Sequence, residues 1–166
     1  MKLNLGCGKK HMEGYVNVDL DNNWSSLKPD LIADISKRLP FDDESVDEVA
    51  SFHVIEHFYR YDIENILEDW IRVLKKGGTF VVECPCLNKI LELYNHFLSK
   101  QIPVEPQMTI YGLYGNPGYR VPEMTHKWCY SVMELKSLLE SYGLKVVTEK
   151  PTTHFPVRDM RLVGIK

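Results

Sequence analysis

Five short apolar segments in the first half of the chain constrain its fold most. They cover residues 3–5, 15–18, 31–33, 48–52 and 79–84, and Gly, Pro or Asp residues bound them. Short runs of this kind are typical of strands in a buried parallel sheet. Between the last two, apolar residues recur at helical spacing over residues 63–74, and Lys75-Lys76-Gly77-Gly78 follows as a cationic last turn and a glycine stop.

The second half of the chain predicts two further helices and two strands. Apolar positions over residues 90–98 have helical spacing, and Ser131-x-x-Glu134 is a capping box that opens a helix ending at Gly143. Residues 145–148 and 161–165 read as strands, close enough along the chain to pair antiparallel. The prediction is an α/β fold: a mainly parallel sheet, helices on both faces, and an antiparallel hairpin at the C-terminal edge.

Length and composition limit the classes of protein that fit. The chain has 166 residues, so we expect a single domain over residues 1–166. It is 44% hydrophobic with a formal net charge of -3, which excludes a mainly disordered chain and disfavours a nucleic-acid partner. No apolar run approaches the roughly 20 residues that cross a bilayer, and no signal peptide is recognisable. We therefore expect a cytoplasmic protein; the sequence does not indicate its oligomeric state.

The four cysteines do not predict a metal site. Cys84-x-Cys86 is tighter than the usual zinc spacing of two to four intervening residues, and no second Cys/His pair stands nearby. Free thiols are expected for a chain without a secretion signal.

Residues 102–124 are rich in Pro, Gly and Tyr and predict one long loop. Long loops in compact domains are often functional. We interpret residues 102–130 as a substrate-covering loop within the domain; a packed structural loop is the alternative.

Candidate ligand-binding residues stand where three predicted strands end. Asn4-Leu5-Gly6-Cys7-Gly8 closes the first strand with a glycine turn that lets the backbone approach a ligand. Asp19 ends the second strand, where a carboxylate can accept both hydroxyls of a ribose. Asp34 ends the third, followed by Ile35, and can accept from an adenine amino group or serve as a turn residue.

Five ordered motifs carry a family resemblance. Leu3-Asn4-Leu5-Gly6-Cys7-Gly8, Asn17-Val18-Asp19-Leu20, Asp34 with Leu39-Pro40-Phe41, His53-Val54-Ile55-Glu56-His57 and Arg72-Val73-Leu74-Lys75-Lys76-Gly77-Gly78 resemble the class I S-adenosylmethionine-dependent methyltransferases. The type-11-like branch is most similar. The resemblance implies a Rossmann-like fold and S-adenosylmethionine as cofactor.

The resemblance also assigns residues to the cofactor. Gly6, Cys7 and Gly8 would line its methionine and ribose, Asp19 would bind the ribose, and Leu20 would pack on adenine. Asp34 and Ile35 would hold the adenine edge, and His53 would lie beside the sulfonium. Asn4 and Phe52 complete the implied cofactor site. Glu56 and His57 are expected to order the local backbone rather than to contact substrate.

The chain departs from the family pattern after its glycine turn. Only residues 9–14 separate the turn from the second strand, fewer than a βαβ crossover normally needs. We therefore expect a first crossover helix shortened to about one turn, which weakens the cover over the methionine carboxylate. Lys9, Lys10 or His11 could supply a counter-charge, or they form a solvated basic turn.

The sequence indicates the methyl acceptor and the catalytic residues less directly than the cofactor site. If the acceptor is a hydroxyl, a base is needed, and His126 is the first candidate and His53 the second; both could instead be structural. Five aromatic residues could line a pocket for a small-molecule or saccharide acceptor, or pack within the loop: Tyr111, Tyr114, Tyr119, Trp128 and Tyr130.

Two other functions stay open. A non-catalytic S-adenosylmethionine-binding or partner-activating module fits the short first crossover. A nicotinamide-dependent oxidoreductase fits poorly, because His11 stands where the third glycine of its motif would be.

Overall fold

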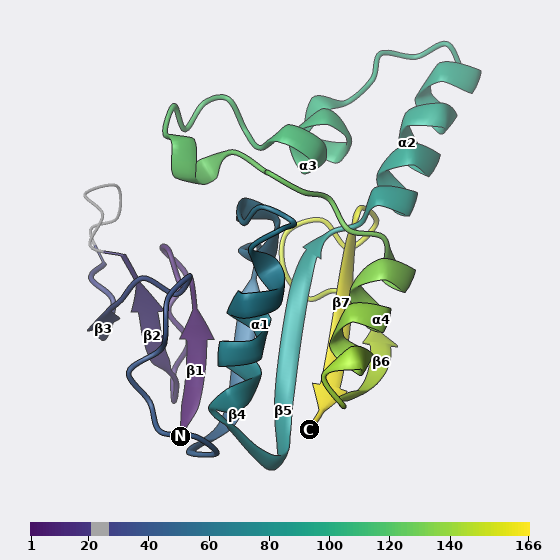
Figure 1. Ribbon diagram of the computed structural model, residues 1–166. Helices are drawn as coiled ribbons and strands as arrows, with labels where there is room; N and C mark the ends of the chain where they lie inside the picture. Colours follow the sequence, from purple (N-terminus) through teal and green to yellow (C-terminus); the bar gives the residue numbers. More distant parts are fainter. Residues whose placement is uncertain (21–26) are drawn as a thin grey trace.

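The computed structural model describes residues 1–20 and 27–166, and its strands form a single sheet (Figure 1). The strands are β1 (Lys2–Leu5), β2 (Val16–Asp19), β3 (Leu31–Ile32), β4 (Val46–Phe52), β5 (Leu74–Pro85), β6 (Lys145–Glu149) and β7 (Asp159–Ile165). Their order is β3-β2-β1-β4-β5-β7-β6, and β7 runs antiparallel to both of its neighbours. The predicted parallel sheet with a C-terminal antiparallel hairpin is confirmed.

Four α-helices and three short 3-10 helices accompany the described strands. The α-helices are α1 (Ile63–Arg72), α2 (Leu87–Ser99), α3 (Ile110–Tyr114) and α4 (Val132–Ser141). The 3-10 helices are η1 (Ile55–His57), η2 (Pro106–Met108) and η3 (Pro122–Met124). The predicted cap at Ser131 is confirmed, since its side chain accepts from the Glu134 amide, but the Glu134 carboxylate accepts from Trp128 and Arg60 and does not close the box. Among the described residues, no helix is both long and apolar enough to cross a bilayer.

One face of the sheet carries the hydrophobic core. Leu3 and Leu5 of β1 share a buried cluster with Phe80 of β5, with Trp70 of α1 and with Leu135 of α4. Both helices therefore pack on that face, in front of the sheet in Figure 1. The helices were expected on both faces. Over β1 and β2, the opposite face carries polar side chains in place of a described helix.

Those polar side chains form a network that holds the first crossover. Asn4 Nδ2 donates to Asn17 Oδ1 and to the Lys10 carbonyl, both at 2.9 Å, and Asn17 Oδ1 also accepts from the Met12 amide at 2.8 Å. The crossover itself contains two turns, closed by Lys10 and Tyr15 amides, rather than the single helical turn we expected. The buried amides thus replace the packing that a helix would provide.

The end of α1 differs from the prediction. The helix stops at Arg72, and Leu74 through Gly78 already belong to β5 rather than to a helical last turn. The Arg72 carbonyl accepts from the Glu44 amide, and the Val73 carbonyl accepts from the amides of Ser45 and Val46 at the start of β4. These bonds join the chain to the sheet directly after the helix. Besides Arg72 in its last turn, the helix end has a cation from outside the helix: Lys166 Nζ donates to the carbonyls of Ile71 and Leu74.

The segment over residues 102–124 is not one irregular loop. It contains η2, α3 and η3, and with α2 it extends beyond the carboxyl ends of the parallel strands (Figure 1). Gly112 of α3 lies against Ile90 of α2, where an added Cβ would come within 2.6 Å of Ile90 Cδ1. This close approach needs a residue without a side chain. The pattern of Pro, Gly and Tyr concealed short helices because each is only one or two turns long.

Candidate active site

A cavity of about 1200 Å³ lies at the carboxyl edge of the sheet, beneath the 102–124 segment. Ligands bind at this edge in open α/β sheets. Every residue that the sequence suggested for cofactor binding or as a general base contributes to its wall: Asn4, Gly6, Cys7, Gly8, Asp19, Leu20, Asp34, Ile35, Phe52, His53 and His126. The structure therefore brings together residues from the ends of four strands and from the segment before α4.

The glycine turn is tied to the end of β2. The amides of Gly6 and Cys7 donate to the Val18 carbonyl, and the Gly8 amide donates to Asp19 Oδ2 at 2.6 Å. Gly6 has a φ of 68°, and a Cβ there would lie 2.5 Å from Val54 Cγ2. Gly8 has a φ of 51°, but a Cβ there would meet no atom within 4 Å. The turn thus leaves open space at Gly8, which a ligand can approach closely.

Hydrogen bonds fix the segment that follows β3. The Trp70 indole donates to the Ile35 carbonyl at 2.8 Å, and Asp34 Oδ1 accepts from the amide and hydroxyl of Ser36 at 2.9 and 2.6 Å. Asp34 therefore forms the turn that the sequence allowed, and it also lies in the cavity wall. Leu20, on the far side, is 43% exposed and offers an apolar surface.

His53 lies between two buried carboxylates. Its Nδ1 is 3.3 Å from Glu56 Oε1 and its Nε2 is 3.2 Å from Asp159 Oδ2. The His53 backbone has a φ of 57°, a strained conformation for a residue with a Cβ, and its amide donates to the Glu83 carbonyl at 2.7 Å. The ring of His154 meets it edge-on, with centroids 4.1 Å apart.

These charges set the protonation of His53 and Glu56. Burial opposes the charged imidazole, but the carboxylates of Asp159 and Glu56 outweigh it and raise the pKa of His53 to about 9. Burial likewise opposes the Glu56 carboxylate, but His53 lowers the pKa of Glu56 to about 2. At neutral pH His53 is therefore an imidazolium, which cannot accept a further proton.

The comparisons with known proteins bear on this site directly. The family model for the type-11 methyltransferase domain matches residues 3–82, the part of the chain that supplies the glycine turn, Asp19, Asp34 and His53. Residues 3–82, just under half of the chain, are therefore identified as a methyltransferase domain. A comparison with curated protein sequences found no match.

Solved structures share the fold of this methyltransferase at low sequence identity. An S-adenosylmethionine-dependent methyltransferase from Archaeoglobus fulgidus superposes with a TM-score of 0.67 and 18% identity, over 99% of this chain and 85% of its own. One from Methanosarcina mazei gives 0.65 and 18%, over 99% and 91%. A chain from the complex of the Haloferax volcanii Trm112 methyltransferase activator with a methyltransferase gives 0.59 and 19%, over 99% and 80%.

The cavity of the methyltransferase fits S-adenosylmethionine, its cofactor. The open space at Gly8 suits the chain of a methionine, and Asp19 stands at the strand end where a ribose binds. When bound, the cofactor supplies a methyl group as an electrophilic carbon on sulfur. Lys9 and Lys10 of the first crossover also line the cavity, on the side where counter-charge for a carboxylate was expected.

Sequence reasoning missed the contribution of the β6–β7 connection. His154, Phe155 and Arg158 line the cavity, although they lie far from every recognised motif. Arg158 Nε donates to Asp159 Oδ1 at 2.6 Å and its Nη1 donates to the Gln107 carbonyl at 2.7 Å. Arg158 thereby links β7 to η2 in the covering segment. The one signal in the sequence was the pair of charges next to a predicted strand, which is common at strand ends.

The predicted aromatic wall is only partly present. Tyr111 and Tyr119 line the cavity. Tyr114 is 67% exposed outside it, Trp128 donates to Glu134 Oε1 at 3.0 Å at the start of α4, and Tyr130 is buried in the core beside a bridge to Cys86. Of the two interpretations, a pocket lined by all five aromatic residues is therefore wrong, since Trp128 is bonded to Glu134 of α4 and Tyr130 is buried in the core.

Proposed function

We propose that the protein transfers the methyl group to an oxygen atom of a small-molecule acceptor, such as a saccharide. The observation that carries this proposal is the size of the cavity. Pockets for one small ligand occupy roughly 300–1,000 Å³. The cavity of about 1200 Å³ has room for a second small ligand beside the cofactor.

The lining under the covering segment supports the class of acceptor. Tyr111 and Tyr119 offer aromatic surface, and Gln107, Asn116 and Glu123 offer hydrogen-bonding groups in the same wall. Aromatic faces combined with a few polar groups suit a ligand that has both apolar ring faces and hydroxyls. This combination, together with the net charge of -3, favours a sugar-like molecule over a nucleic acid.

His126 is the proposed residue that activates the acceptor hydroxyl. Its Nδ1 lies 2.9 Å from the Gly112 carbonyl, so Nδ1 carries the proton and Nε2 keeps its lone pair. His53 stands as an imidazolium between Glu56 and Asp159, and we assign it the positioning of the chain beside the reacting sulfur. The remaining work of the protein is to hold the acceptor oxygen in line with the methyl carbon.

Calorimetric titration tests the cofactor residues first. We expect S-adenosylhomocysteine to bind the wild type at micromolar strength, about -8 kcal/mol, and Asp19→Ala to lose more than tenfold in affinity. Asp19→Asn keeps an oxygen for the Gly8 amide and separates loss of the ribose contact from loss of the turn. Asp42→Ala, which removes an exposed carboxylate outside the cavity, should bind as the wild type does. Unchanged affinity in Asp19→Ala would contradict the ribose assignment.

An acceptor screen with cofactor labelled in its methyl group tests the substrate class. We expect label on hydroxyl oxygens of monosaccharides or similar small molecules, and a large loss of turnover in His126→Gln with cofactor affinity retained. Label that appears only on protein or nucleic acid would overturn the proposal.

A cofactor-binding module that acts through a partner protein is the second candidate. One structural neighbour comes from a complex with a methyltransferase activator, and residues 9–15 of this chain contain no helix to cover the cofactor. If S-adenosylhomocysteine binds but no acceptor is methylated by the protein alone, this candidate replaces the first.

A further inference from the structure

The carboxylate of Glu56 is buried without a hydrogen bond. The residue is 1% exposed, and neither Oε1 nor Oε2 has a hydrogen-bond partner among the described residues. His53 Nδ1 faces Oε1 at 3.3 Å and balances part of the charge. A buried charged group normally accepts several hydrogen bonds or coordinates a metal. Glu56 therefore has coordination capacity that the protein itself leaves unused.

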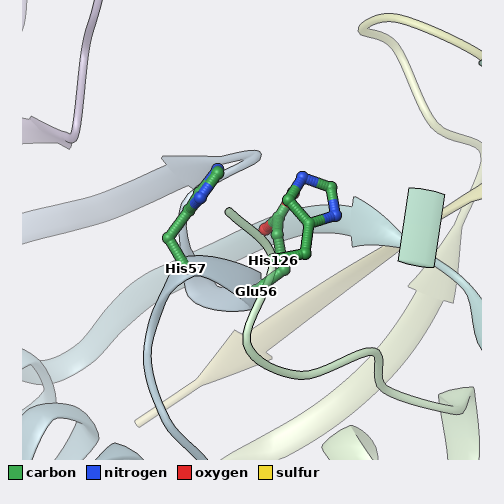
Figure 2. Close-up of side chains that lie close together, drawn as sticks. All are labelled: Glu56, His57 and His126. Atoms are coloured by element: carbon green, nitrogen blue, oxygen red, sulfur yellow. The ribbon is translucent and has the colours of Figure 1, made fainter. Parts of the chain in front are cut away.

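Two histidines stand at the same place. His57 follows Glu56 in η1, and His126 comes from the segment after η3; Figure 2 shows the three side chains gathered there. One ligand atom from each lies within 4.8 Å of the others. The backbone joins the two segments, because the Glu56 carbonyl accepts from the amides of Lys127 and Trp128 at 2.8 and 3.2 Å.

The outer hydrogen bonds of both rings leave the same nitrogen available. His57 Nδ1 lies 3.3 Å from the Thr125 carbonyl, and His126 Nδ1 lies 2.9 Å from the Gly112 carbonyl. With Nδ1 as the donor in each ring, Nε2 carries a lone pair. Histidines that bind metals almost always donate their other nitrogen to a carbonyl or carboxylate in this way.

We propose that Glu56, His57 and His126 bind a divalent transition-metal cation, of which Zn²⁺ is the best match. Two imidazole nitrogens and one carboxylate form the ligand set of catalytic zinc and related sites, which keep further positions open. Among the described residues, this is the only group of three His, Cys, Asp or Glu side chains placed for such binding. The sequence analysis predicted no metal site, because it considered only the spacing of the cysteines.

The geometry requires a small closure. Ligand atoms about 2.0–2.2 Å from a zinc ion lie roughly 3–4 Å apart, so the three side chains must close by about 1 Å. The two rings are already close, with centroids 4.8 Å apart and planes that cross at 89°. His57 and His126 both line the cavity, so the open positions of the cation face the acceptor.

The chemical use of the cation rests on the proposed function. Bound there, it would coordinate the acceptor hydroxyl and lower its pKa, so that the proton leaves to water. The oxygen then bonds to the methyl carbon while the carbon–sulfur bond breaks and its electron pair stays on sulfur. In this arrangement His126 activates the acceptor hydroxyl through the cation that its Nε2 would hold, and water takes the proton.

Cobalt titration of chelator-treated protein tests the site without an acceptor. We expect visible absorption that saturates at one Co²⁺ per chain, displacement by Zn²⁺, and no competition from Mg²⁺, which prefers oxygen ligands. Substituting groups that merely support metal ligands costs 10–100-fold in affinity. His57→Gln and Glu56→Gln should therefore each lose at least about 100-fold, while His96→Gln, which removes an exposed histidine of α2, should bind as the wild type does.

The outcomes separate this proposal from the proposed function. Titration of S-adenosylhomocysteine into the same samples reports whether the fold and the cofactor site are intact. Failure of the wild type to bind one Co²⁺ while it binds S-adenosylhomocysteine would overturn the metal site alone. Equal Co²⁺ affinity in His57→Gln, Glu56→Gln and His96→Gln would also overturn it, and thiolate-to-cobalt absorption would move the ligands to the cysteines.

Discussion

Glu83→Gln is the substitution for which the structure gives the sharpest expectation. Glu83 is fully buried in β5, where its two oxygens accept from the amides and hydroxyls of Thr152 and Thr153. Arg161 of β7 donates to the same carboxylate at 3.3 Å. Glu83 thus fixes the start of the connection that carries His154 and Arg158 to the cavity.

The cost of the substitution follows from these contacts. Glutamine keeps the shape but turns one acceptor oxygen into an NH₂ group that faces donors, so a buried donor loses its partner and Arg161 loses its counter-charge. Hydrogen bonds to charged groups contribute about 1.5–3 kcal/mol, and breaking a buried ion pair costs about 3–5 kcal/mol. Because Arg161 reaches solvent and also pairs with Glu149, we expect a loss of about 3 kcal/mol.

Urea unfolding and thermal melting measure this loss. For a domain of this size, about 3 kcal/mol corresponds to a fall in Tm of about 6–12 °C. Glu149→Gln is the matched control, since Glu149 pairs with the same arginine at 3.1 Å but is half-exposed. Exposed ion pairs contribute about 0–1 kcal/mol, so Glu149→Gln should unfold nearly as the wild type does.

The pH dependence provides a second check. Burial raises the pKa of Glu83, but hydrogen bonds from Thr152, Thr153 and Arg161 outweigh it and hold the pKa below its ordinary value of 4.5. The carboxylate therefore stabilises the fold fully above about pH 4.5 and loses that contribution as the pH falls through its folded pKa. The gap between wild type and Glu83→Gln should narrow in acid. A gap that equals that of Glu149→Gln, or that stays constant from neutral to acidic pH, would refute the reasoning.

Three further substitutions test other parts of the structure. Gly6→Ala should lower stability by about 2–3 kcal/mol in urea unfolding, because its Cβ would overlap Val54 at positive φ; stability equal to the wild type would contradict the geometry of the turn. Trp70→Phe should lose the hydrogen bond to the Ile35 carbonyl and weaken S-adenosylhomocysteine binding several-fold in calorimetry, whereas an effect on stability alone would show that this bond does not position the site. Lys166→Met should cost about 1–2 kcal/mol because the Ile71 and Leu74 carbonyls lose their charged donor, and Lys166→Arg should restore part of it.

The sequence predicted the parts of the molecule that depend on local pattern. The apolar runs located the strand ends within two residues, except that β5 begins five residues earlier than predicted, and the cap at Ser131 located the start of α4. The residues that end β1, β2, β3 and β4 were identified as site residues because chain direction in a parallel sheet brings strand ends to one edge. These inferences needed only the periodicity of neighbours along the chain.

Interactions between distant residues could not be inferred in the same way. Lys166, distant in the sequence, donates to a carbonyl at the end of α1. The prediction instead assigned Lys75 and Lys76 to the last turn of this helix, which ends at Arg72. The short helices η2 and α3 contact Arg158, and α3 also packs against α2; like η3, both are too short to show helical periodicity. Tyr130 lies in the core near α4 and not in the pocket where it was expected.

The sequence by itself determined the fold class, the family resemblance and the edge of the sheet where the candidate site lies, because backbone periodicity and turn chemistry are properties of adjacent residues. Only the tertiary structure decided how charges are shared at the site. His53 is held between Glu56 and Asp159, which are 103 positions apart in the chain, and His57 meets His126 across two segments. Protonation and ligand geometry depend on distances of a few ångströms between such residues, and those distances exist only after the chain has folded.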